Sequence, residues 1–499
     1  MSMTYFPSEL SEPEALLARM SALRQQVYTD GCALFARWRP QIHRRVFLAG
    51  ALNLAYYIAL RRQDIRPLQR ALRPWGLSSL GRSEGRVLQN LDAVLATLSV
   101  LCGREPATLP PRPTLRSFLR GERLLQRAAE ELLGPSVPHR RVQIMVTLDR
   151  TAADNPSFVH ELIQRGMDCA RINCAHDDVE TWAVMVGHVR AAAKETGRAC
   201  TVYMDLAGPK VRTGSVITPK PKSRLQRDDL ILLTREEGRS AVALPFQASC
   251  TEPKVFEHLA VGHSVWFDDG HIGCRVEELR PEGAILRVFA VRAKGERLKA
   301  DKGINFPNTL LALNRLTKKD LRDLDFAAMH ADIVGYSFVE QAADIALLQQ
   351  EIQARVAGKK RPPGIVAKIE TPVAVTNLPD LIVQAAGQQP FGVMIARGDL
   401  AVELGYQRLA EMQEEILWLC EAAHAPVIWA TQVLENLTKH GIPSRAEITD
   451  AAMAERAECV MLNKGPYVAE AVTILDDVLT RMQGHQLKKT PTLRALRSW

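Results

Sequence analysis

The spacing of hydrophobic residues divides the chain near residue 140. Before that point, apolar residues recur at helical intervals over residues 14–28, 42–62 and 86–102, with breaks at 106–113 and 134–138. This spacing predicts a helical N-terminal extension over residues 1–138. Its most apolar stretch, residues 46–60, is about five residues shorter than a membrane span requires and contains Asn53, so we expect a buried helix there.

From residue 141 onwards, short apolar and β-branched runs alternate with amphipathic segments. Strands are predicted at residues 142–147, 168–173, 199–206, 333–337, 364–369, 392–396, 426–431 and 459–462. Helical patterns lie between and after them, at about 155–165, 179–196, 317–330, 340–356, 372–386, 406–424, 445–457 and 467–483. Strict alternation implies parallel strands, and eight repeats favour a closed barrel over an open sheet. The sequence therefore predicts an α/β fold, a (β/α)8 TIM barrel built from residues 139–213 and 303–485.

One segment interrupts the alternation after the third predicted strand. Residues 214–302 contain many turns and short strand-like runs at 230–233, 264–267 and 284–291. A loop of that length without structure is uncommon, so we expect a small inserted β-domain. On a βα loop it would lie over the mouth of the barrel, where it could act as a lid. Residues 486–499 are expected to form a tail.

Composition and charge narrow the class of protein. With 46% hydrophobic and 24% charged residues, the chain has the composition of an ordinary globular protein. A net charge of +8 fits either nucleic acid or phosphorylated small molecules, but the basic residues are dispersed and no RNA-reading motif occurs. The nine cysteines form no C-x-x-C pair and the N-terminus lacks a secretory signal, so we expect a cytoplasmic protein with reduced thiols. We expect no nucleic-acid or membrane partner.

Charged residues follow the ends of five predicted strands. In a (β/α)8 barrel, active groups gather at the carboxyl ends of the strands, on one face of the domain. The residues at these ends are 171–176, 205–212, 368–370, 397–399 and 431–432.

Lys368 and Glu370 lie two residues apart, so a strand points both side chains to the same face. Asp399 follows the next strand, and two carboxylates from neighbouring strands suit Mg²⁺, which keeps waters and substrate oxygens among its ligands. The alternative to a metal site is a purely structural salt bridge between Lys368 and Glu370. The presence of charged residues at five strand ends argues against this alternative. Arg171, together with Arg212 and Lys302, adds the fixed cations that phosphoryl transfer requires.

Segments spread over residues 140–485 resemble the pyruvate kinase family. GMDCARINCAH is similar to the family's G-M-x-x-A-R-x-N-x-S-H, and MDLAGPKVRTG to its D-x-x-G-P-[KE]-x-R-x-G. The other matching segments, in order, are VWFDDGHIGCRV, KGINFPN, DIVGYSFV, AKIETPVAVTNLPDLI, IARGDLAVELG and WATQVLENLTKHGIPSRAEITDAAMA. The order of AKIE, ARGDL, ATQVLE and PSRAE is highly specific.

The resemblance implies transfer of the phosphoryl group of phosphoenolpyruvate to ADP, giving pyruvate and ATP, by a homo-oligomer. Glu370 and Asp399 would hold Mg²⁺, which Mn²⁺ could replace. Lys368 would neutralise charge on the phosphoryl and enolate oxygens, and Thr431 would help to protonate the enolate. The implied substrate-binding groups are Ala396, Arg397, Gly398, Asp399 and Thr431. The implied phosphate-binding groups are Arg171, Asn173, His176, Arg212 and Lys302. Arg171 would also be catalytic.

Three positions depart from the family's potassium site. Ala175 and Leu206 stand where many members have serine and threonine ligands, and Lys210 stands where they have glutamate. We hypothesise that the Lys210 ammonium takes the place of potassium as a fixed cation, so that potassium is not needed.

Other departures concern the nucleotide and regulation. Residues 463–467 read NKGPY and lack the hydroxyl and acidic groups of the family's loop, and TLDRTA replaces the family's TIGPAS after the first strand. The family's C-terminal domain, which hosts sugar-phosphate effectors in many members, has no counterpart, so activation at that site is not expected. Two alternatives to an active pyruvate kinase stay open: a related Mg²⁺-dependent barrel enzyme for phosphoenolpyruvate or another keto acid with a different acceptor or none, and a non-catalytic homologue.

Overall fold

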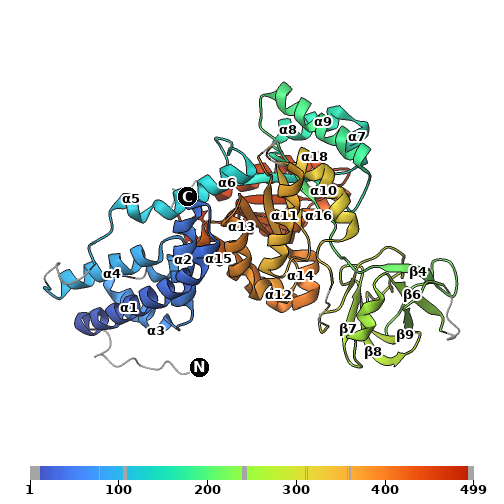
Figure 1. Ribbon diagram of the computed structural model, residues 1–499, viewed down its shortest axis with the longest axis horizontal. Coiled ribbons are helices and arrows are strands. Elements are labelled where there is room, and N and C mark those ends of the chain that lie inside the picture. Colours follow the sequence, from blue (N-terminus) through green and yellow to red (C-terminus); the bar gives the residue numbers. More distant parts are fainter. Residues whose placement is uncertain are drawn as a thin grey trace.

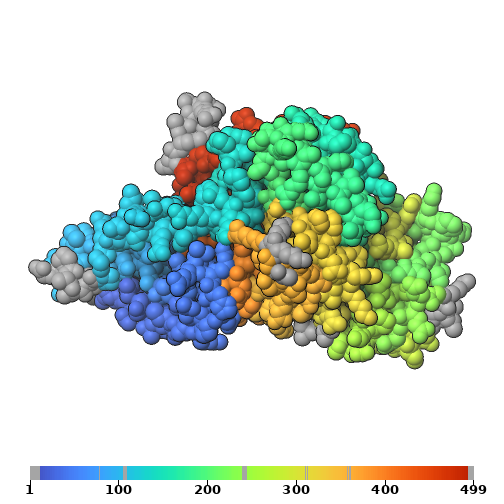
Figure 2. All heavy atoms as spheres, turned by 45° about the horizontal axis from the view of Figure 1, so that its top comes forward, coloured from blue at the N-terminus to red at the C-terminus, as the bar shows by residue number. Residues whose placement is uncertain are grey.

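A computed structural model describes residues 12–77, 79–104, 110–238, 244–309, 311, 313–356, 358 and 361–492. The molecule is elongated, with a barrel at its centre (Figures 1 and 2). The N-terminal helices lie at one end and a separate β-sheet lies at the other, so the barrel contacts both additions.

Eight parallel strands close the central barrel, as the sequence predicts. They are β1 Gln143–Leu148, β2 Cys169–Asn173, β3 Thr201–Asp205, β11 Ile333–Tyr336, β12 Gly364–Ile369, β13 Phe391–Ala396, β14 Val427–Val433 and β15 Cys459–Leu462. The order around the barrel is β1-β15-β14-β13-β12-β11-β3-β2. Nearly every residue of these strands is buried, because side chains point either into the barrel or against the surrounding helices.

The helices around the barrel match the predicted helical patterns. They are α8 Pro156–Arg165, α9 Val179–Thr196, α10 Lys318–His330, α11 Ala342–Val356, α13 Leu378–Ala386, α15 Tyr406–Ala423, α17 Arg445–Met453 and α18 Val468–Met482. Local sequence explains several of their starts. Asn155 and Asp178 cap the backbone N–H groups of α8 and α9, and Thr317 and Ser444 form capping boxes with Asp320 and Glu447. Shorter helices follow some strands, namely α7 Arg150–Asp154, α12 Pro372–Thr376, α14 Arg397–Leu404 and α16 Glu435–His440.

The segment between β3 and β11 forms its own sheet with its own hydrophobic core. Within the described residues the sheet has seven strands in the order β10-β7-β8-β9-β5-β6-β4. The strands are β4 Thr213–Ile217, β5 Leu230–Thr234, β6 Phe246–Cys250, β7 Ser264–Phe267, β8 Ile272–Arg280, β9 Gly283–Ala290 and β10 Ile304–Asn305. The turn after β7 reaches the barrel, since Asp269 forms an ion pair with Lys210.

The N-terminal extension consists of helices. These are α1 Pro13–Trp38, α2 Leu48–Arg61, α3 Arg66–Leu72, α4 Val87–Leu101, α5 Leu115–Phe118 and α6 Arg120–Leu133. Of these, α2 packs on the barrel's α15, while α1 and α4 pack on α2. The apolar stretch at 46–60 is the buried helix α2, and no described helix is long and apolar enough to cross a membrane. Asn53 anchors α2 by donating to the carbonyls of Glu84 and Ala422, at 2.6 and 2.8 Å. A buried amide with both donors satisfied fixes how α2 lies on the barrel.

Helix α6, which the hydrophobic pattern did not predict, closes the amino-terminal end of the barrel. Leu132 and Leu133 join a buried cluster inside the barrel that includes Tyr203 and Met394. The Thr201 hydroxyl donates to the Leu133 carbonyl at 2.6 Å. At the starts of β12 and β13, an added Cβ on Gly364 or Gly392 would lie 2.4 or 2.6 Å from methyl carbons of Leu132. Two glycines therefore make room for one leucine side chain.

The chain beyond α18 folds back toward the N-terminal extension. Within the expected tail, residues 486–491 form a hairpin of β16 Gln486–Leu487 and β17 Thr490–Pro491, and residues 493–499 lie outside the described residues. Lys488 in the turn donates to the Arg456 carbonyl at 2.9 Å, and Lys489 pairs with Glu84. The hairpin thus connects the end of the barrel to the N-terminal helices.

We predict that Leu132 and Gly392 are energetically coupled. Leu132→Ala leaves a cavity and should lower the free energy of unfolding by about 2–5 kcal/mol. Gly392→Ala adds a methyl group against Leu132 and should cost about 1–3 kcal/mol. In the double variant the small side chain at 132 accommodates the new methyl, so the total cost should be less than the sum. Urea unfolding followed by tryptophan fluorescence measures all four proteins, and strict additivity would contradict the packing described.

Candidate active site

Two adjoining cavities open at the carboxyl ends of the barrel strands. The inner one, of about 220 Å³, is lined by Lys368, Glu370 and Asp399, and the outer one, of about 580 Å³, by His176 and Lys302. The residues that line both are Arg171, Asn173, Lys210, Arg212, Asp269, Thr431, Met461 and Asn463. The charged groups predicted from five strand ends therefore gather at one mouth.

Lys368 lies at the centre of the inner cavity. Its ammonium is 3.2 Å from Glu370 and 3.4 Å from Asp205, and it donates to the Ser337 hydroxyl at 2.6 Å. Burial would lower the pKa of Lys368, but Asp205 and Glu370 outweigh this and raise it. Lys368 is therefore a fixed positive charge, and its partners come from three different strand ends.

The Glu370 carboxylate is buried, the Asp399 carboxylate is largely buried, and both face the same cavity. Burial raises the pKa of Glu370, Lys368 opposes the rise, and the negative charge of Asp399 adds to it. Burial would also raise the pKa of Asp399, but Lys210 overcomes this effect and lowers it. Their mutual repulsion is a force that a bound cation would relieve.

Lys210 makes the closest cationic contact with Asp399. Its ammonium donates to the two carboxylate oxygens at 2.9 and 3.1 Å, and Asp269 of the inserted sheet lies 3.4 Å away. Asp399 and Asp269 raise the pKa of Lys210 despite its burial. The ammonium is thus a permanent part of the mouth.

The donor chemistry of the inner cavity fits a hard divalent cation such as Mg²⁺. Glu370 accepts one backbone N–H, from Phe338 at 2.6 Å, and contacts Lys368, so its two oxygens keep free lone pairs. Asp399 is more fully occupied, by Lys210 and by the Asn305 amide at 3.2 Å. No cluster of three or more candidate ligands occurs among the described residues. An ion held by these two carboxylates would therefore take other ligands from water and substrate, which is the usual habit of Mg²⁺.

Arg171 is buried between the two cavities. Its guanidinium forms hydrogen bonds with Asp205 at 2.5 and 3.0 Å and with the Thr147 hydroxyl at 3.0 Å. Burial would raise the pKa of Asp205, but Lys368 and Arg171 outweigh it and lower the pKa. One carboxylate, Asp205, therefore orients both Arg171 and Lys368.

Thr431 is held in a strained backbone conformation at the end of β14. Its φ is +65°, an uncommon value for a β-branched residue, and the pairing of β14 with β15 shifts register between Trp429 and Val433. Arg397 fixes this turn by donating to the Thr431 carbonyl at 2.5 Å and by pairing with Asp450. The Thr431 hydroxyl accepts the Gly398 N–H at 2.9 Å. Such strain commonly marks a functional position.

Basic residues line the outer cavity. Arg212 and Lys302 project from the base of the inserted sheet, and Lys302 pairs with Asp268 at 2.9 Å. Burial lowers the pKa of His176, and the nearby cations Lys464 and Arg212 lower it further. The cavity is thus a cationic environment with one imidazole kept neutral.

The structure brings together nearly all side chains singled out in the sequence. The Arg397 side chain lines neither cavity because it points to Asp450, although its neighbours Ala396 and Gly398 line the inner one, and the backbone role expected for Arg397 stays a prediction. Sequence reasoning assigned no role to several lining or contacting residues, namely Asp205, Asp269, Ser337, Asn305, Glu403 and Lys439. Asp205, Asp269, Asn305 and Glu403 all stand inside segments that resemble the family, and those segments could have marked them.

Comparisons with known proteins indicate one family. The family model described as the barrel domain of pyruvate kinase matches residues 139–472. A protein of Thermococcus litoralis named pyruvate kinase is 31% identical over 370 residues, which cover 73% of this chain and 74% of the relative. A pyruvate kinase of Agrobacterium vitis is 33% identical over 359 residues, covering 70% of this chain and 69% of the relative. A pyruvate kinase of Mycobacterium intracellulare is 32% identical over 359 residues, which cover 70% of this chain and 72% of the relative.

Glu403 lies beside this site on α14, one helical turn after Asp399. It accepts the second Asn305 N–H at 3.0 Å. Burial raises the pKa of Glu403 from 4.5 to about 7, the Asn305 hydrogen bond opposes this, and Asp399 adds to it. Between these two pH values the folded protein keeps a proton that the unfolded chain has lost, so stability falls as pH rises through this window.

We predict that Glu403→Gln stabilises the protein at pH 8 and not at pH 4. The amide keeps an oxygen for Asn305 and removes the penalty of a buried charge, so the gain should be about 1–3 kcal/mol at pH 8. Urea unfolding from pH 4 to 8 measures the difference. Glu411→Gln, at an exposed position on α15, is the matched control and should show no such trend. An equal effect of Glu403→Gln at both pH values would contradict the raised pKa.

Proposed function

The chain belongs to the pyruvate kinase family and is an enzyme of that type, and on this premise we propose that it transfers the phosphoryl group of phosphoenolpyruvate to ADP with Mg²⁺ and without potassium. The observation that carries the proposal is the convergence of Lys368, Glu370 and Asp399 in one cavity. Arg171 joins this cavity to a second, cationic one that can take nucleotide phosphates. Small-molecule substrates follow from the family, and cytoplasmic location and a homo-oligomer stay predictions.

Glu370 and Asp399 would hold the Mg²⁺, which supplies positive charge to the substrate's carboxylate and phosphoryl oxygens when bound. Mn²⁺ could replace it. The protein's own groups do the rest of the electrostatic work. Lys368 offers an ammonium that burial and two carboxylates hold in place, and Arg171 offers a guanidinium already oriented by Asp205. Fixed charges of this kind need no reorganisation during the reaction.

The reaction breaks the bond between phosphorus and the enol oxygen and forms a bond from phosphorus to a terminal oxygen of ADP. The enolate that remains takes a proton at its methylene carbon. Thr431 would help to deliver it, and the hydrogen bond in which its oxygen accepts the Gly398 N–H supports this role because the hydroxyl proton stays available. Solvent then restores the proton of Thr431. The strained turn that Arg397 holds fixes the direction of this hydroxyl.

The outer cavity would receive the nucleotide. Arg212, Lys302 and the neutral His176 would contact its phosphates, with Asn173 at the boundary between the cavities. Ala396 at the end of β13, and Arg397 and Gly398 at the start of α14, would offer backbone groups to the substrate carboxylate. Lys464 and Asn463 also line the outer cavity, where they replace the family's acidic and hydroxyl groups. This replacement favours a second candidate, a related enzyme that keeps the enolate chemistry but uses another phosphoryl acceptor.

We predict that pyruvate formation depends on Lys368 and on a nucleoside diphosphate. A lactate-dehydrogenase-coupled assay with phosphoenolpyruvate, Mg²⁺ and a panel of diphosphates should show activity that Lys368→Met lowers about 100- to 1000-fold. Lys194→Met removes an exposed lysine from α9 and is the matched control. Pyruvate formation without any diphosphate would support the second candidate. Equal rates of pyruvate formation in the wild type and in Lys368→Met would contradict both candidate functions.

We predict that potassium leaves the rate unchanged. Lys210 places a buried ammonium 2.9 Å from Asp399, which supports the view that a fixed cation already supplies the charge. The measurement compares rates with potassium chloride and with tetramethylammonium chloride at equal ionic strength. A large rate increase with potassium would contradict the role proposed for Lys210.

A further inference from the structure

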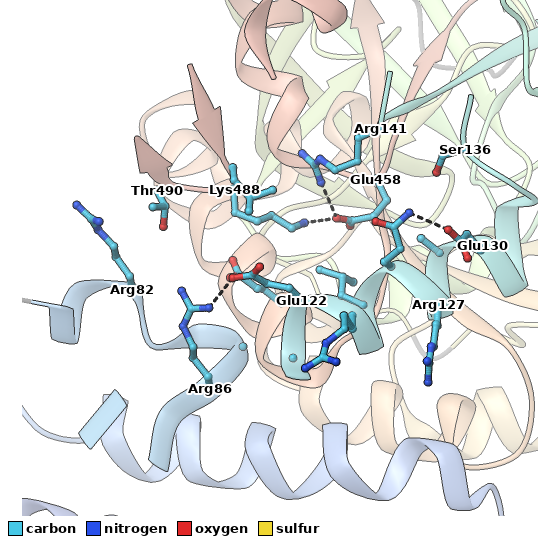
Figure 3. A pocket seen from close by; sticks show the side chains of 18 residues that line it. Arg82, Arg86, Glu122, Arg127, Glu130, Ser136, Arg141, Glu458, Lys488 and Thr490 are labelled. Atoms are coloured by element: carbon cyan, nitrogen blue, oxygen red, sulfur yellow. Dashed lines mark hydrogen bonds and ion pairs between the residues drawn. The ribbon is translucent and has the colours of Figure 1, made fainter. Parts of the chain in front are cut away.

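A separate pocket of about 460 Å³ lies at the opposite end of the barrel from the active site. Its walls come from η5 Ser79–Arg82, η6 Glu84–Arg86, one face of α6, the end of α15 and the C-terminal hairpin (Figure 3). A cavity of this size suits a small metabolite. Because elements from both the extension and the barrel form the walls, a ligand there would join the two.

The pocket carries an excess of positive charge. Six basic side chains line it, Arg82, Arg86, Arg123, Arg127, Arg141 and Lys488, against the four acidic ones, Glu122, Glu130, Glu421 and Glu458. Burial raises the pKa of Glu421 to about 7, an effect that Lys488 opposes, so the negative charge of this wall is reduced near neutral pH. The balance therefore favours an anionic ligand.

Three of these cations, Arg82, Arg123 and Arg127, have no carboxylate partner in the described part of the chain, and Arg123 donates instead to the carbonyls of Leu119, at 3.3 Å, and Arg116. Arg82 lies on η5 and Arg127 lies on α6, and Figure 3 shows the two residues on opposite sides of the pocket. Arg86 pairs with Glu122 at 2.5 Å, yet its Nε is buried without an acceptor among the described residues. The protein's own acceptors thus satisfy these arginines only in part. Arg141 and Lys488, by contrast, form ion pairs with Glu458.

Helix α6 connects this pocket to the catalytic strands. Its residues 122, 123, 126, 127 and 130 face the pocket, and its last two leucines fill the amino-terminal end of the barrel. Leu132 packs directly against the first residues of β12 and β13. Lys368 lies four residues after Gly364 in β12, about 13 Å further along at 3.3 Å per residue, and Asp399 follows the end of β13. At its other end α6 cannot move closer to η6, because a Cβ on Gly121 would lie 1.9 Å from the Gly85 carbonyl.

The barrel wall of the pocket is also tied to strand starts. Glu458, which Lys488 and Arg141 flank, accepts the Val427 N–H at 2.9 Å. Its own carbonyl accepts the Gln143 N–H at 2.9 Å. A group bound beside Glu458 would therefore act on the first residues of β1 and β14 as well.

From this arrangement we propose that the pocket binds a small anion with phosphate or carboxylate groups and that the bound anion changes the kinetics of the active site through α6. The unpaired cations Arg82 on the extension and Arg123 and Arg127 on α6 would attract the anion into the pocket. The binding step stands independently, whereas the kinetic effect rests on the function proposed above.

Binding is tested with inorganic phosphate and succinate on the full chain, without Mg²⁺, by thermal unfolding and isothermal titration. Either anion should raise the midpoint of unfolding, and the stronger one identifies the preferred group. Arg82→Gln with Arg127→Gln should weaken binding roughly tenfold or more. Arg227→Gln with Arg322→Gln removes two exposed arginines that line neither this pocket nor the catalytic cavities, and should leave binding unchanged.

The active site also holds cations, so a second variant separates the two sites. Arg212→Gln with Lys302→Met should keep binding at the α6 pocket. Three results would overturn the proposal. They are loss of all binding in that variant, binding by the Arg82→Gln, Arg127→Gln protein equal to that of the wild type, and no binding of either anion by the wild type.

The kinetic effect is tested by the phosphoenolpyruvate dependence of the rate at fixed free Mg²⁺. The preferred anion should change KM or kcat of the wild type at least about twofold, and the Arg82→Gln, Arg127→Gln protein should lose this response while keeping its basal rate. Binding with no kinetic change in an active enzyme would refute the coupling. An inactive wild type would instead refute the proposed function, and the binding result would stand.

Discussion

The requirement that every buried charge at the barrel mouth has an opposite charge nearby governs the site. Lys368, Arg171 and Lys210 face Asp205, Glu370 and Asp399, so three cations balance three carboxylates. Removing a single partner would leave a buried charge without compensation, which is far more costly than losing a surface ion pair. The same balance means that an anionic substrate can enter together with a divalent cation while the net charge of the mouth changes little.

The barrel and its mouth were predictable because both follow from local periodicity. A parallel strand buried on both faces reads as a short apolar run, and all strand ends of a closed barrel meet on one face. Lys368 and Asp399 could therefore be placed together before any coordinates were known. The strained turn at Thr431 could not, since it depends on Arg397, and the direction of the Arg397 side chain is decided by Asp450, 53 positions later.

Helix α6 shows a second limit of the sequence. Its buried leucines, Leu125, Leu132 and Leu133, are few, and the pattern does not reveal that the last two enter the barrel. Their partners are contributed by strands from Met145 to Met461, so no local window contains them. Asn305 is similar, because its contacts with Asp399 and Glu403 join an inserted strand to a helix about 100 positions away. Long-range packing of this kind becomes visible only in three dimensions.

The position of Lys210 bears on the order in which ligands would bind. An ammonium 2.9 Å from Asp399 occupies lone pairs that a metal would otherwise use and repels a second cation. On the proposed role of Glu370 and Asp399, Mg²⁺ alone would therefore bind weakly at this mouth. A substrate that brings a carboxylate and a phosphoryl group supplies the missing negative charge and further oxygen ligands. Metal and substrate should consequently bind cooperatively, and a permanent cation at residue 210 is the physical reason.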